Sequence, residues 1–291
     1  MAIASPTVGF ERARRRLRGR GTTVVGRVSV ADRLAIGSLV ALSVLCLIVP
    51  WLAPHSATKP AGLPFVHPGH SGFLFGTDEV GRDVLSRVLI GLRASWLASL
   101  VVIASGVLIG GGIGLVAGAT GGWVDSVLMR ITDVFLALPG PVLAIAVVAA
   151  MGPSLQHTLI GVAIVWWPFY ARIVRGEIRA LASRPHVEAA RLAGASRWRV
   201  MRRHLLPGAV PATVVTASLD VGNLVLTLAA LSFLGLGAPA PAPELGAMAA
   251  RGLPYLLEQW WVPVIPGLAV FALALVANLA GDGLRDLMGD R

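Results

Sequence analysis

Six apolar runs, each close to twenty residues long, constrain the fold of this chain more than any other feature of its sequence. They lie near residues 34–54, 94–118, 130–151, 157–176, 209–236 and 262–281. A helix of about 20 residues covers the roughly 30 Å hydrocarbon core of a bilayer, and in lipid each spanning segment must satisfy its own backbone hydrogen bonds. With 55% hydrophobic and 14% charged residues, the chain cannot hide these runs in a soluble core. The sequence therefore predicts an all-α polytopic membrane protein with six transmembrane helices.

Glycine and proline inside the runs indicate where helices pack closely. The second run has small residues at every fourth position, a spacing that lets another helix approach. Its glycines are Gly106, Gly110, Gly111, Gly112, Gly114 and Gly118. The third and fourth runs are interrupted by Pro139, Gly140 and Pro141 and by Pro168, and lipid tolerates such breaks only where neighbours or water pair the freed carbonyls. We expect both interrupted runs to face protein.

Arginine predicts the orientation of the chain. Eight arginines lie between Arg12 and Arg33, and nine between Arg172 and Arg203. If both termini are cytoplasmic, both groups lie inside, and the positive-inside rule favours this arrangement for a multi-pass plasma (inner) membrane protein. The basic residues then left outside are Lys59, Arg82, Arg87, Arg93 and Arg251. Residues 1–30 are interpreted as a basic cytoplasmic leader resting on anionic membrane lipid, and residues 31–291 as the transmembrane domain.

A polar, arginine-rich segment, residues 183–207, separates the fourth and fifth runs. It predicts a short helix, a turn at Gly194 and Ala195, and a second short helix capped by Ser196, whose hydroxyl can accept from the N–H groups that open that helix. Pro207 predicts a break before apolar sequence resumes. A helical hairpin between two membrane helices suits the transmission of force from a soluble partner. A plain basic cytoplasmic loop has the same charge pattern and is the alternative interpretation.

Several classes of function lack the residues they need. No G-x-x-x-x-G-K-[ST] loop occurs and Lys59 is the only lysine, so any ATP chemistry belongs to a partner chain. Cys46 is the only cysteine, which excludes a disulfide within the chain. The net charge of +10 reflects membrane topology, and no soluble basic face indicates a nucleic-acid partner. Serine, histidine and acidic residues are too scattered to predict a triad, so we expect no enzyme active site, cofactor or metal in this chain.

Two carboxylates lie inside predicted membrane helices, where charge is costly and often functional. Asp133 lies near the cytoplasmic face, and we expect an ion pair with Arg130 on the same helix, with a pathway role as the alternative. Asp220 lies deeper, beside Asn223. Asp220 and Asn223 are therefore candidate pathway residues, and a structural role for them stays open.

The segment 183–207 also resembles a longer signature. It matches the pattern EAA-x3-G-x9-I-x-L-P of the permease subunits of bacterial ABC importers. The matching residues are Glu188, Ala189, Ala190, Gly194, Leu206 and Pro207. The isoleucine position holds His204, which we expect to pack half-exposed at the edge of the loop. Four further segments resemble the second-subunit type of the dipeptide, oligopeptide and nickel branch, and they lie at residues 75–95, 121–139, 230–248 and 260–286.

This resemblance, which covers about residues 30 to 287, implies the type I ABC importer permease fold and a function in peptide import. The chain would form half of a translocation pathway for short peptides, and a second homologous permease chain would complete a heterodimer. Residues 183–207 would be the coupling helix that docks on two P-loop ATPase subunits, which bind ATP and Mg. The coupling residues would be Glu188, Ala189, Ala190, Arg191, Gly194, Leu206 and Pro207. Glu188 and Arg191 can pair with opposite charges on the ATPase.

On the outer side, the resemblance implies that an extracytoplasmic substrate-binding protein docks on this chain. Residues 76–87 interleave apolar and charged side chains, which predicts an amphipathic helix along the outer membrane surface. The proline-rich loop 236–261, with Trp260 and Trp261 at the membrane interface, is a second candidate docking surface.

Three alternatives stay open at this point. The same architecture serves importers of nickel or glutathione, and one pore-lining subunit does not separate these substrates from peptides. A membrane scaffold or sensor whose hairpin binds a soluble partner is another interpretation, although glycine and proline breaks favour a moving pathway. An ion-driven secondary transporter would be expected to show inverted repeats, and none is visible.

Overall fold

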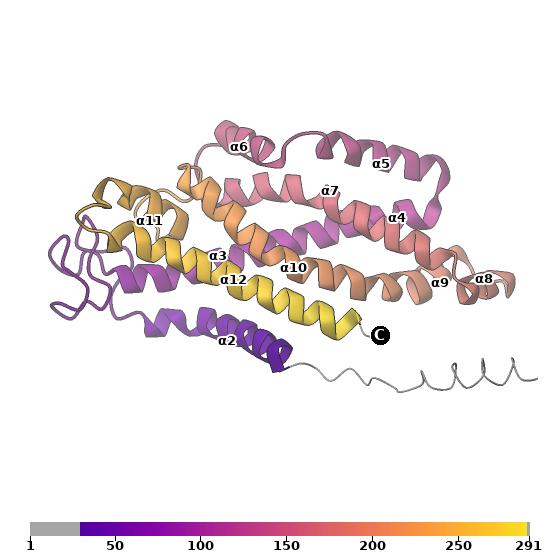
Figure 1. The fold of residues 1–291 in the computed structure, drawn as a ribbon. Coiled ribbons are helices and arrows are strands. Elements are labelled where there is room, and N and C mark those ends of the chain that lie inside the picture. The colour runs from indigo at the N-terminus through magenta and orange to yellow at the C-terminus, as the bar shows by residue number, and fades with distance from the viewer. Residues whose placement is uncertain (1–29, 290–291) are drawn as a thin grey trace, which may run out of the picture.

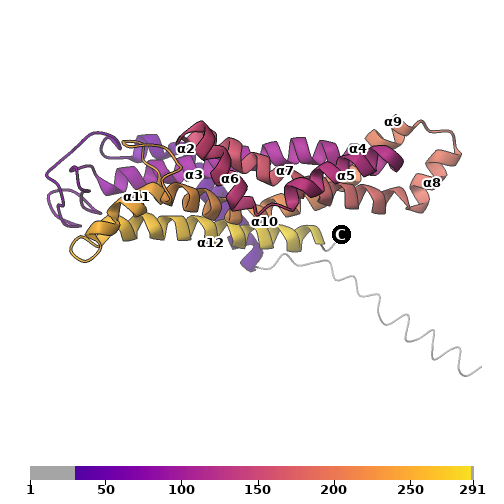
Figure 2. The ribbon, with the colours of Figure 1, turned by 90° about the horizontal axis from the view of Figure 1, so that it is seen from above.

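The computed structural model describes residues 30–289, with side chains from Gly37 to Asp286 apart from Leu39. All regular elements in this range are helices. The long helices run roughly along one axis, so the molecule is elongated (Figure 1). Helices α8 and α9 lie at one end, called here the hairpin end, and the loops around α11 lie at the other, called the outer end (Figures 1 and 2). The predicted basic leader falls outside the described residues except for Val30.

The described helices are α2 (Val30–Leu52), α3 (Val84–Ser105), α4 (Gly111–Thr120), α5 (Gly122–Leu136), α6 (Gly140–Met151), α7 (Leu155–Ala182), α8 (Pro185–Leu192), α9 (Arg197–Val200), α10 (Leu206–Phe233), α11 (Leu245–Gly252) and α12 (Trp261–Gly289). Two π-helical turns, Gly106–Gly110 and Met201–Leu205, join α3 to α4 and α9 to α10. Each pair therefore forms one unbroken helix of 37 residues. A 3₁₀ turn, Leu253–Tyr255, follows α11.

Four of the six predicted spans are confirmed as single helices long and apolar enough to cross a membrane. They are Val84–Thr120, Leu155–Ala182, Arg197–Phe233 and Trp261–Asp286. The predicted third span is a bent pair, because α5 and α6 meet at 82° where Pro139 and Gly140 interrupt the chain. The predicted first span falls on α2, whose described apolar part is Val40–Leu52. The described residues thus contain four complete spans, one bent pair and one shorter apolar helix.

The glycines at every fourth position of the second span pack against α7, as their spacing predicts. A Cβ added at Gly110 would lie 2.0 Å from the carbonyl oxygen of Trp167, and one at Gly114 would lie 2.3 Å from that of Ala171. Gly106 and Gly118 approach side chains of α7 in the same way. Only glycine allows the two backbones to come this close. This contact fixes α4 along α7, which lies in the middle of the bundle.

The expectation that both interrupted runs face protein is confirmed within this chain for α7, and for most of α5 and α6 it stays a prediction about another chain. Pro168 is buried inside α7, which packs against α3, α4, α6 and α10. Helices α5 and α6 lie on the outside of the bundle (Figure 1). Val134 and Val142 are each 60% exposed, so much of these two helices is left for lipid or another chain.

The outer end is a cap formed by the loop at residues 53–83 and by residues 234–260, which include α11, and it packs on the ends of α3 and α12. The prediction of an amphipathic helix over residues 76–87 is wrong. The segment is a loop until Asp83, which caps α3 by accepting from the N–H groups of Leu85 and Ser86. Gly76 and Gly81 have φ of +74° and +87°, values that end a right-handed helix and that side chains disfavour.

The charged residues of this segment turn inward and pair with one another. The carboxylate of Asp78 accepts from Arg82 at 2.6 Å and lies 3.4 Å from Arg87 Nε. Arg87 is 1% exposed and also donates to the carbonyls of Ala57 at 2.6 Å and Pro241 at 3.2 Å. The guanidinium of Arg87 therefore ties both loop segments of the cap to α3.

The expected interfacial tryptophan pair is divided between two environments. Trp260 is 54% exposed, whereas Trp261 is 1% exposed. The indole N–H of Trp261 donates to the carbonyl of Thr77 at 3.1 Å, so this residue packs the cap and does not reach its surface. Only Trp260 remains available for an outer docking surface.

Candidate coupling site and membrane cavity

The hairpin at residues 183–207 begins with α8, whose end is set by Gly194. The N–H of Ala195 donates to Ala190 O and the N–H of Gly194 donates to Arg191 O, each at 3.0 Å. These two bonds form the Schellman motif, which requires a left-handed residue after the helix. Gly194 supplies it with φ of +82°. The predicted turn at Gly194 and Ala195 is confirmed, and its physical reason is the C-terminal cap of α8.

The second helix of the hairpin also begins as predicted but does not stop at Pro207. The hydroxyl of Ser196 accepts from the N–H of Arg199 at 3.3 Å and caps α9. The predicted break at Pro207 is wrong, because the π turn Met201–Leu205 carries the helix into α10. In this turn Leu206 N–H donates to Met201 O, five residues earlier. The wider turn accommodates the proline ring, which in a regular helix would clash with the carbonyl four residues before it.

One side of α8 is anchored and the other is open. Val187 is fully buried in an apolar cluster at the base of the hairpin. The cluster also contains Val174, Ile178 and Leu181 of α7, Val200 of α9, Leu205 of the π turn and Ala209 of α10. Glu188, Ala189 and Arg191 are exposed and Ala190 is half-buried. Leu192, the last residue of α8, is 90% exposed. The helix therefore presents the EAA residues outward from a rigid base.

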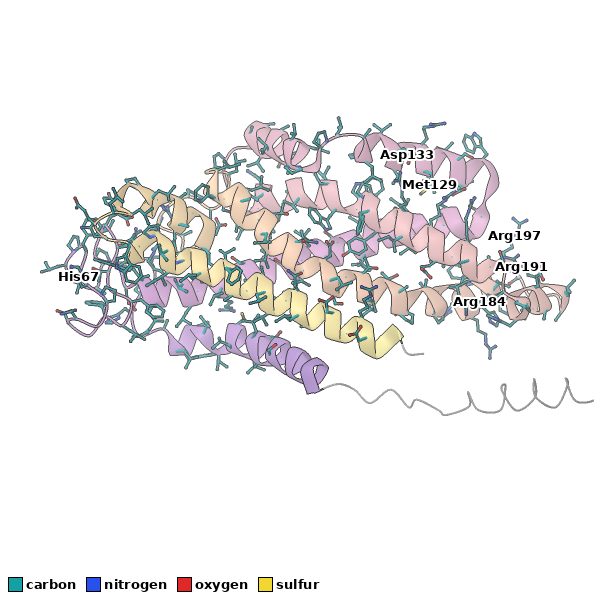
Figure 3. All side chains as sticks on the ribbon, viewed as in Figure 1. His67, Met129, Asp133, Arg184, Arg191 and Arg197 are labelled. Carbon is teal, nitrogen blue, oxygen red and sulfur yellow. The ribbon has the colours of Figure 1, made fainter. Side chains whose placement is uncertain are left out.

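The structure brings most of the predicted coupling residues together, with two exceptions. Glu188, Ala189, Ala190, Arg191 and Gly194 all lie on α8 or its cap. Figure 3 shows Arg191 extending from this end, together with the labelled Arg184 and Arg197.

The two exceptions belong to the next helix. Leu206 and Pro207 open α10 and are exposed there. His204, in the π turn before them, is half-buried, and its ring centre lies 6.0 Å from that of His186 on α8. The expected half-exposed packing of His204 is confirmed.

Ion pairs link α5 to α7 near the hairpin, and the sequence analysis predicted none of them. Asp125 is 4% exposed and accepts from Arg175 and Arg179 of α7. Asp133 pairs with Arg172 at 2.6 Å, so the predicted pair with Arg130 on its own helix is wrong. The sequence feature that could have predicted the Asp125 pairs is the spacing of Arg175 and Arg179, which are four residues apart on α7 and present two donors to one neighbouring helix.

The second predicted site, at Asp220 and Asn223, faces a cavity of about 390 Å³ between α6, α7 and α10. Trp166 Nε1 and, at 3.2 Å, the Tyr170 hydroxyl donate to one oxygen of Asp220. Asn223 and Thr227 follow on the same face of α10 and line the same cavity. Its other lining residues are Gly140, Pro141, Ala144, Val162, Val165, Trp166 and Phe169. Among the described residues, no three His, Cys, Asp or Glu side chains gather to hold a metal ion.

Comparison with known proteins decides the family. Residues 110–291 match the family model described as binding-protein-dependent transport system inner membrane component. This chain belongs to that family. The probable D,D-dipeptide transport permease DdpC of Escherichia coli K12 is 43% identical over 250 residues, covering 86% of this chain and 84% of the relative.

Two further relatives agree with this family, and one solved structure agrees with its fold. The di/tripeptide permease DppC of Pseudomonas aeruginosa is 40% identical and covers 87% of each chain. The glutathione permease GsiD of Pectobacterium atrosepticum is 40% identical over 90% of this chain and 86% of its own. The inward-facing MetNI methionine ABC transporter matches with a TM-score of 0.57 and 21% identity, covering 68% of this chain and 94% of that one. The all-helical type I permease fold is thereby confirmed.

The hairpin and the cavity of this inner-membrane permease are connected through its helices. The hairpin and the cavity are built on the same two helices, because α7 and α10 bury Val187 at the hairpin end and line the cavity with Trp166 and Asp220 farther along. The two features therefore share the helices α7 and α10.

Proposed function

We propose that this permease imports short peptides as one half of a heterodimer with a second, homologous permease chain. Two P-loop ATPase subunits bind ATP and Mg and dock at the hairpin end, and a substrate-binding protein docks at the outer end. Relatives named for dipeptide, di/tripeptide and glutathione transport support a peptide substrate. Nickel is the less supported alternative, since none of these three relatives is named for it.

The geometry of α8 carries this proposal. Glu188, Ala189 and Arg191 are exposed, and small alanine side chains keep the helix narrow enough to enter a groove on an ATPase subunit. Val187 ties the opposite side of α8 to α7 and α10. When nucleotide closes the two ATPase subunits, the pull on α8 therefore reaches the helices that line the cavity.

The direction of the chain agrees with docking from the cytoplasm. Helix α2 begins, and α12 ends, toward the hairpin end of the molecule (Figure 1). The hairpin also carries Arg184, Arg191, Arg197, Arg199, Arg202 and Arg203. Under the positive-inside rule this end is cytoplasmic, so we propose that both helical ends of the described chain face the ATPase side.

Replacement of Gly194 tests the coupling role. Gly194→Glu places a charged side chain at φ of +82°, where side chains are strained, and at the surface of the proposed contact. We expect peptide import in proteoliposomes to fall about tenfold or more, the factor that follows from losing roughly 1.4 kcal/mol of coupling, while the chain stays membrane-inserted. ATP hydrolysis by the complex should no longer respond to substrate.

Gly69→Glu is the matched control, because Gly69 also has positive φ, +79°, and open space around it, but lies at the outer end. Its import should exceed that of Gly194→Glu. Normal substrate-dependent import by Gly194→Glu would refute the coupling role.

Purification of the chain from its native membrane tests the partners. Mass spectrometry should find a P-loop ATPase and a second permease. A variant in which both Glu188 and Gly194 are replaced should lose the ATPase. Recovery of the chain alone, in a detergent that preserves other membrane complexes, would favour a scaffold or a stand-alone transporter.

Import of dipeptide and of glutathione by the intact complex, measured side by side, separates the two peptide substrates.

A further inference from the structure

Three aspartates lie on the helices packed against α7, and one of them differs from the others. Asp125 is paired with two arginines, and Asp133 is paired with Arg172. Asp220 is 8% exposed, and no ion pair in the described part of the chain includes it. Its donors, the Trp166 indole and the Tyr170 hydroxyl, are both neutral. A charge in this position is costly unless a cation reaches it.

The place that a cation would occupy is the cavity beside Asp220. Trp166 and Phe169 contribute aromatic rings to its wall, and ring faces attract an ammonium group. The amide of Asn223 and the hydroxyl of Thr227 line the same cavity and offer oxygen acceptors. The other residues that line the cavity, such as Ala144, are mostly apolar. One carboxylate, neutral acceptors and aromatic rings suit an organic ammonium group, whereas a hard divalent ion takes six or more oxygen ligands.

We propose that this cavity binds the terminal ammonium group of a peptide in transit, with Asp220 as its counter-ion and Trp166 and Phe169 as its aromatic wall. The inference rests on the proposed function, because it names the chemical group of the substrate that the permease itself contacts. The permease would then select for a free amino terminus independently of the substrate-binding protein. Tyr170 and the Trp166 indole hold the carboxylate in place for this contact.

The test uses the purified complex with its partner permease and ATPase subunits, without the binding protein. The probe is (4-benzoyl)phenylalanyl-alanine, a dipeptide with a photoreactive benzophenone side chain and a free amino terminus, and the control probe is its N-acetylated form. Labelling of α6, α7 and α10 is quantified by mass spectrometry. We expect the free-amine probe to label the cavity, and Asp220→Asn to reduce that labelling about tenfold or more, as expected for loss of a hydrogen bond to a charged group.

Two further variants keep the test valid if Asp220→Asn does not fold. Asp133→Asn removes a membrane carboxylate that does not line the cavity. Its labelling should stay within about twofold of the wild-type level, since exposed ion pairs contribute little to stability. Asn223→Lys puts an ammonium group on the same face of α10, three residues from Asp220, and should compete with the probe. It should therefore abolish labelling although Asp220 is present.

The two proposals fail in different ways. Equal labelling by the free and acetylated probes, or labelling that survives both Asp220→Asn and Asn223→Lys, would overturn the ammonium site even if peptide import is normal. Absence of peptide import by the complete, reconstituted transporter would overturn the proposed function. Labelling that depends on Asp220 would, in that case, still show a site for an organic ammonium ligand.

Discussion

Charged residues are buried and paired at the outer end of this permease, whereas arginines are exposed at its hairpin end. At the outer end Asp78, Arg82 and Arg87 are all at most 5% exposed and are bonded to one another or to loop carbonyls. At the hairpin end Arg191 and Arg199 are exposed, and no ion pair in the described part of the chain includes them. Charge at the outer end holds the loops together, whereas these arginines of the hairpin stay exposed.

The backbone shows the same contrast. The outer cap is closed by contacts between residues far apart in sequence, such as Arg87 with Pro241, 154 positions away. The hairpin is closed by bonds between close neighbours, such as Ala195 with Ala190. The outer end therefore depends on the whole fold, while the hairpin is defined by its own sequence.

The largest expected effect on stability comes from Arg87 at the outer end. Arg87→Met keeps the apolar stem but leaves two carbonyls and part of Asp78 without their partner. We expect the free energy of unfolding in detergent to fall by about 3 kcal/mol or more, as for other broken buried ion pairs. Arg199→Met, at an exposed arginine of the hairpin, should change it by less than about 0.5 kcal/mol. Similar losses at both ends would abolish the contrast.

The two sides of α8 should separate folding from partner binding. Val187 is fully buried, so Val187→Ala should lower the free energy of unfolding by about 2 kcal/mol through lost burial and a cavity. Leu192 is 90% exposed, so Leu192→Ala should leave stability unchanged and weaken recovery of the ATPase subunits. Thermal unfolding and co-purification measure the two effects. If Leu192→Ala retains the ATPase fully, the exposed end of α8 is not part of the contact.

Local features of this permease could be predicted from its sequence because local physics determines them. Gly194 follows a short amphipathic helix and Ser196 precedes the next, and both caps form where the residue types require them. The glycines of the second span likewise need only their own spacing to indicate a close helix contact. The candidate coupling site was found for the same reason, since most of its residues lie within one turn-helix unit.

Other features depend on which elements meet, and the sequence does not state this. Asp133 was assigned to Arg130 on its own helix, but α7 brings Arg172 closer. Residues 76–87 have amphipathic spacing, yet Gly76 and Gly81 let the segment fold back on distant loops and bury its charges. Pro207 ends a regular helix, but a π turn removes the clash and keeps the helix continuous. In the first two cases tertiary packing overrode a local preference, and at Pro207 a change of local helix geometry did so.

A smaller effect is expected where α5 meets α7. Asp125 accepts from both Arg175 and Arg179, which are themselves partly exposed. Asp125→Asn leaves two like charges facing one weaker acceptor, and we expect the free energy of unfolding to fall by about 1 to 2 kcal/mol. Asp133→Asn breaks one exposed pair and should cost less than about 1 kcal/mol. Equal costs for the two variants would show that burial of Asp125 adds nothing to this contact.

The smallest effect, and the most specific, is the pH dependence of the outer cap. Glu244 is 5% exposed and precedes α11, outside the membrane-spanning helices. Burial raises the pKa of its carboxyl group above the ordinary value for glutamate, and the hydrogen bond from Ala238 N–H at 3.0 Å only partly opposes this. The folded chain therefore keeps a proton on Glu244 at pH values where the unfolded chain has lost it, so stability decreases as pH rises through that interval.

Glu244→Gln removes this titration, because the amide is neutral at every pH and its oxygen can still accept from Ala238. We expect the variant to melt at a higher temperature than the wild-type chain near neutral pH, with the difference shrinking as the pH falls toward the ordinary range of a glutamate. Glu258→Gln, at an exposed glutamate of the same cap, should not change the dependence. A difference for Glu244→Gln that stays constant with pH would mean that the side chain acts through packing alone. The contrast between the ends would then rest on the buried arginine and not on buried acid.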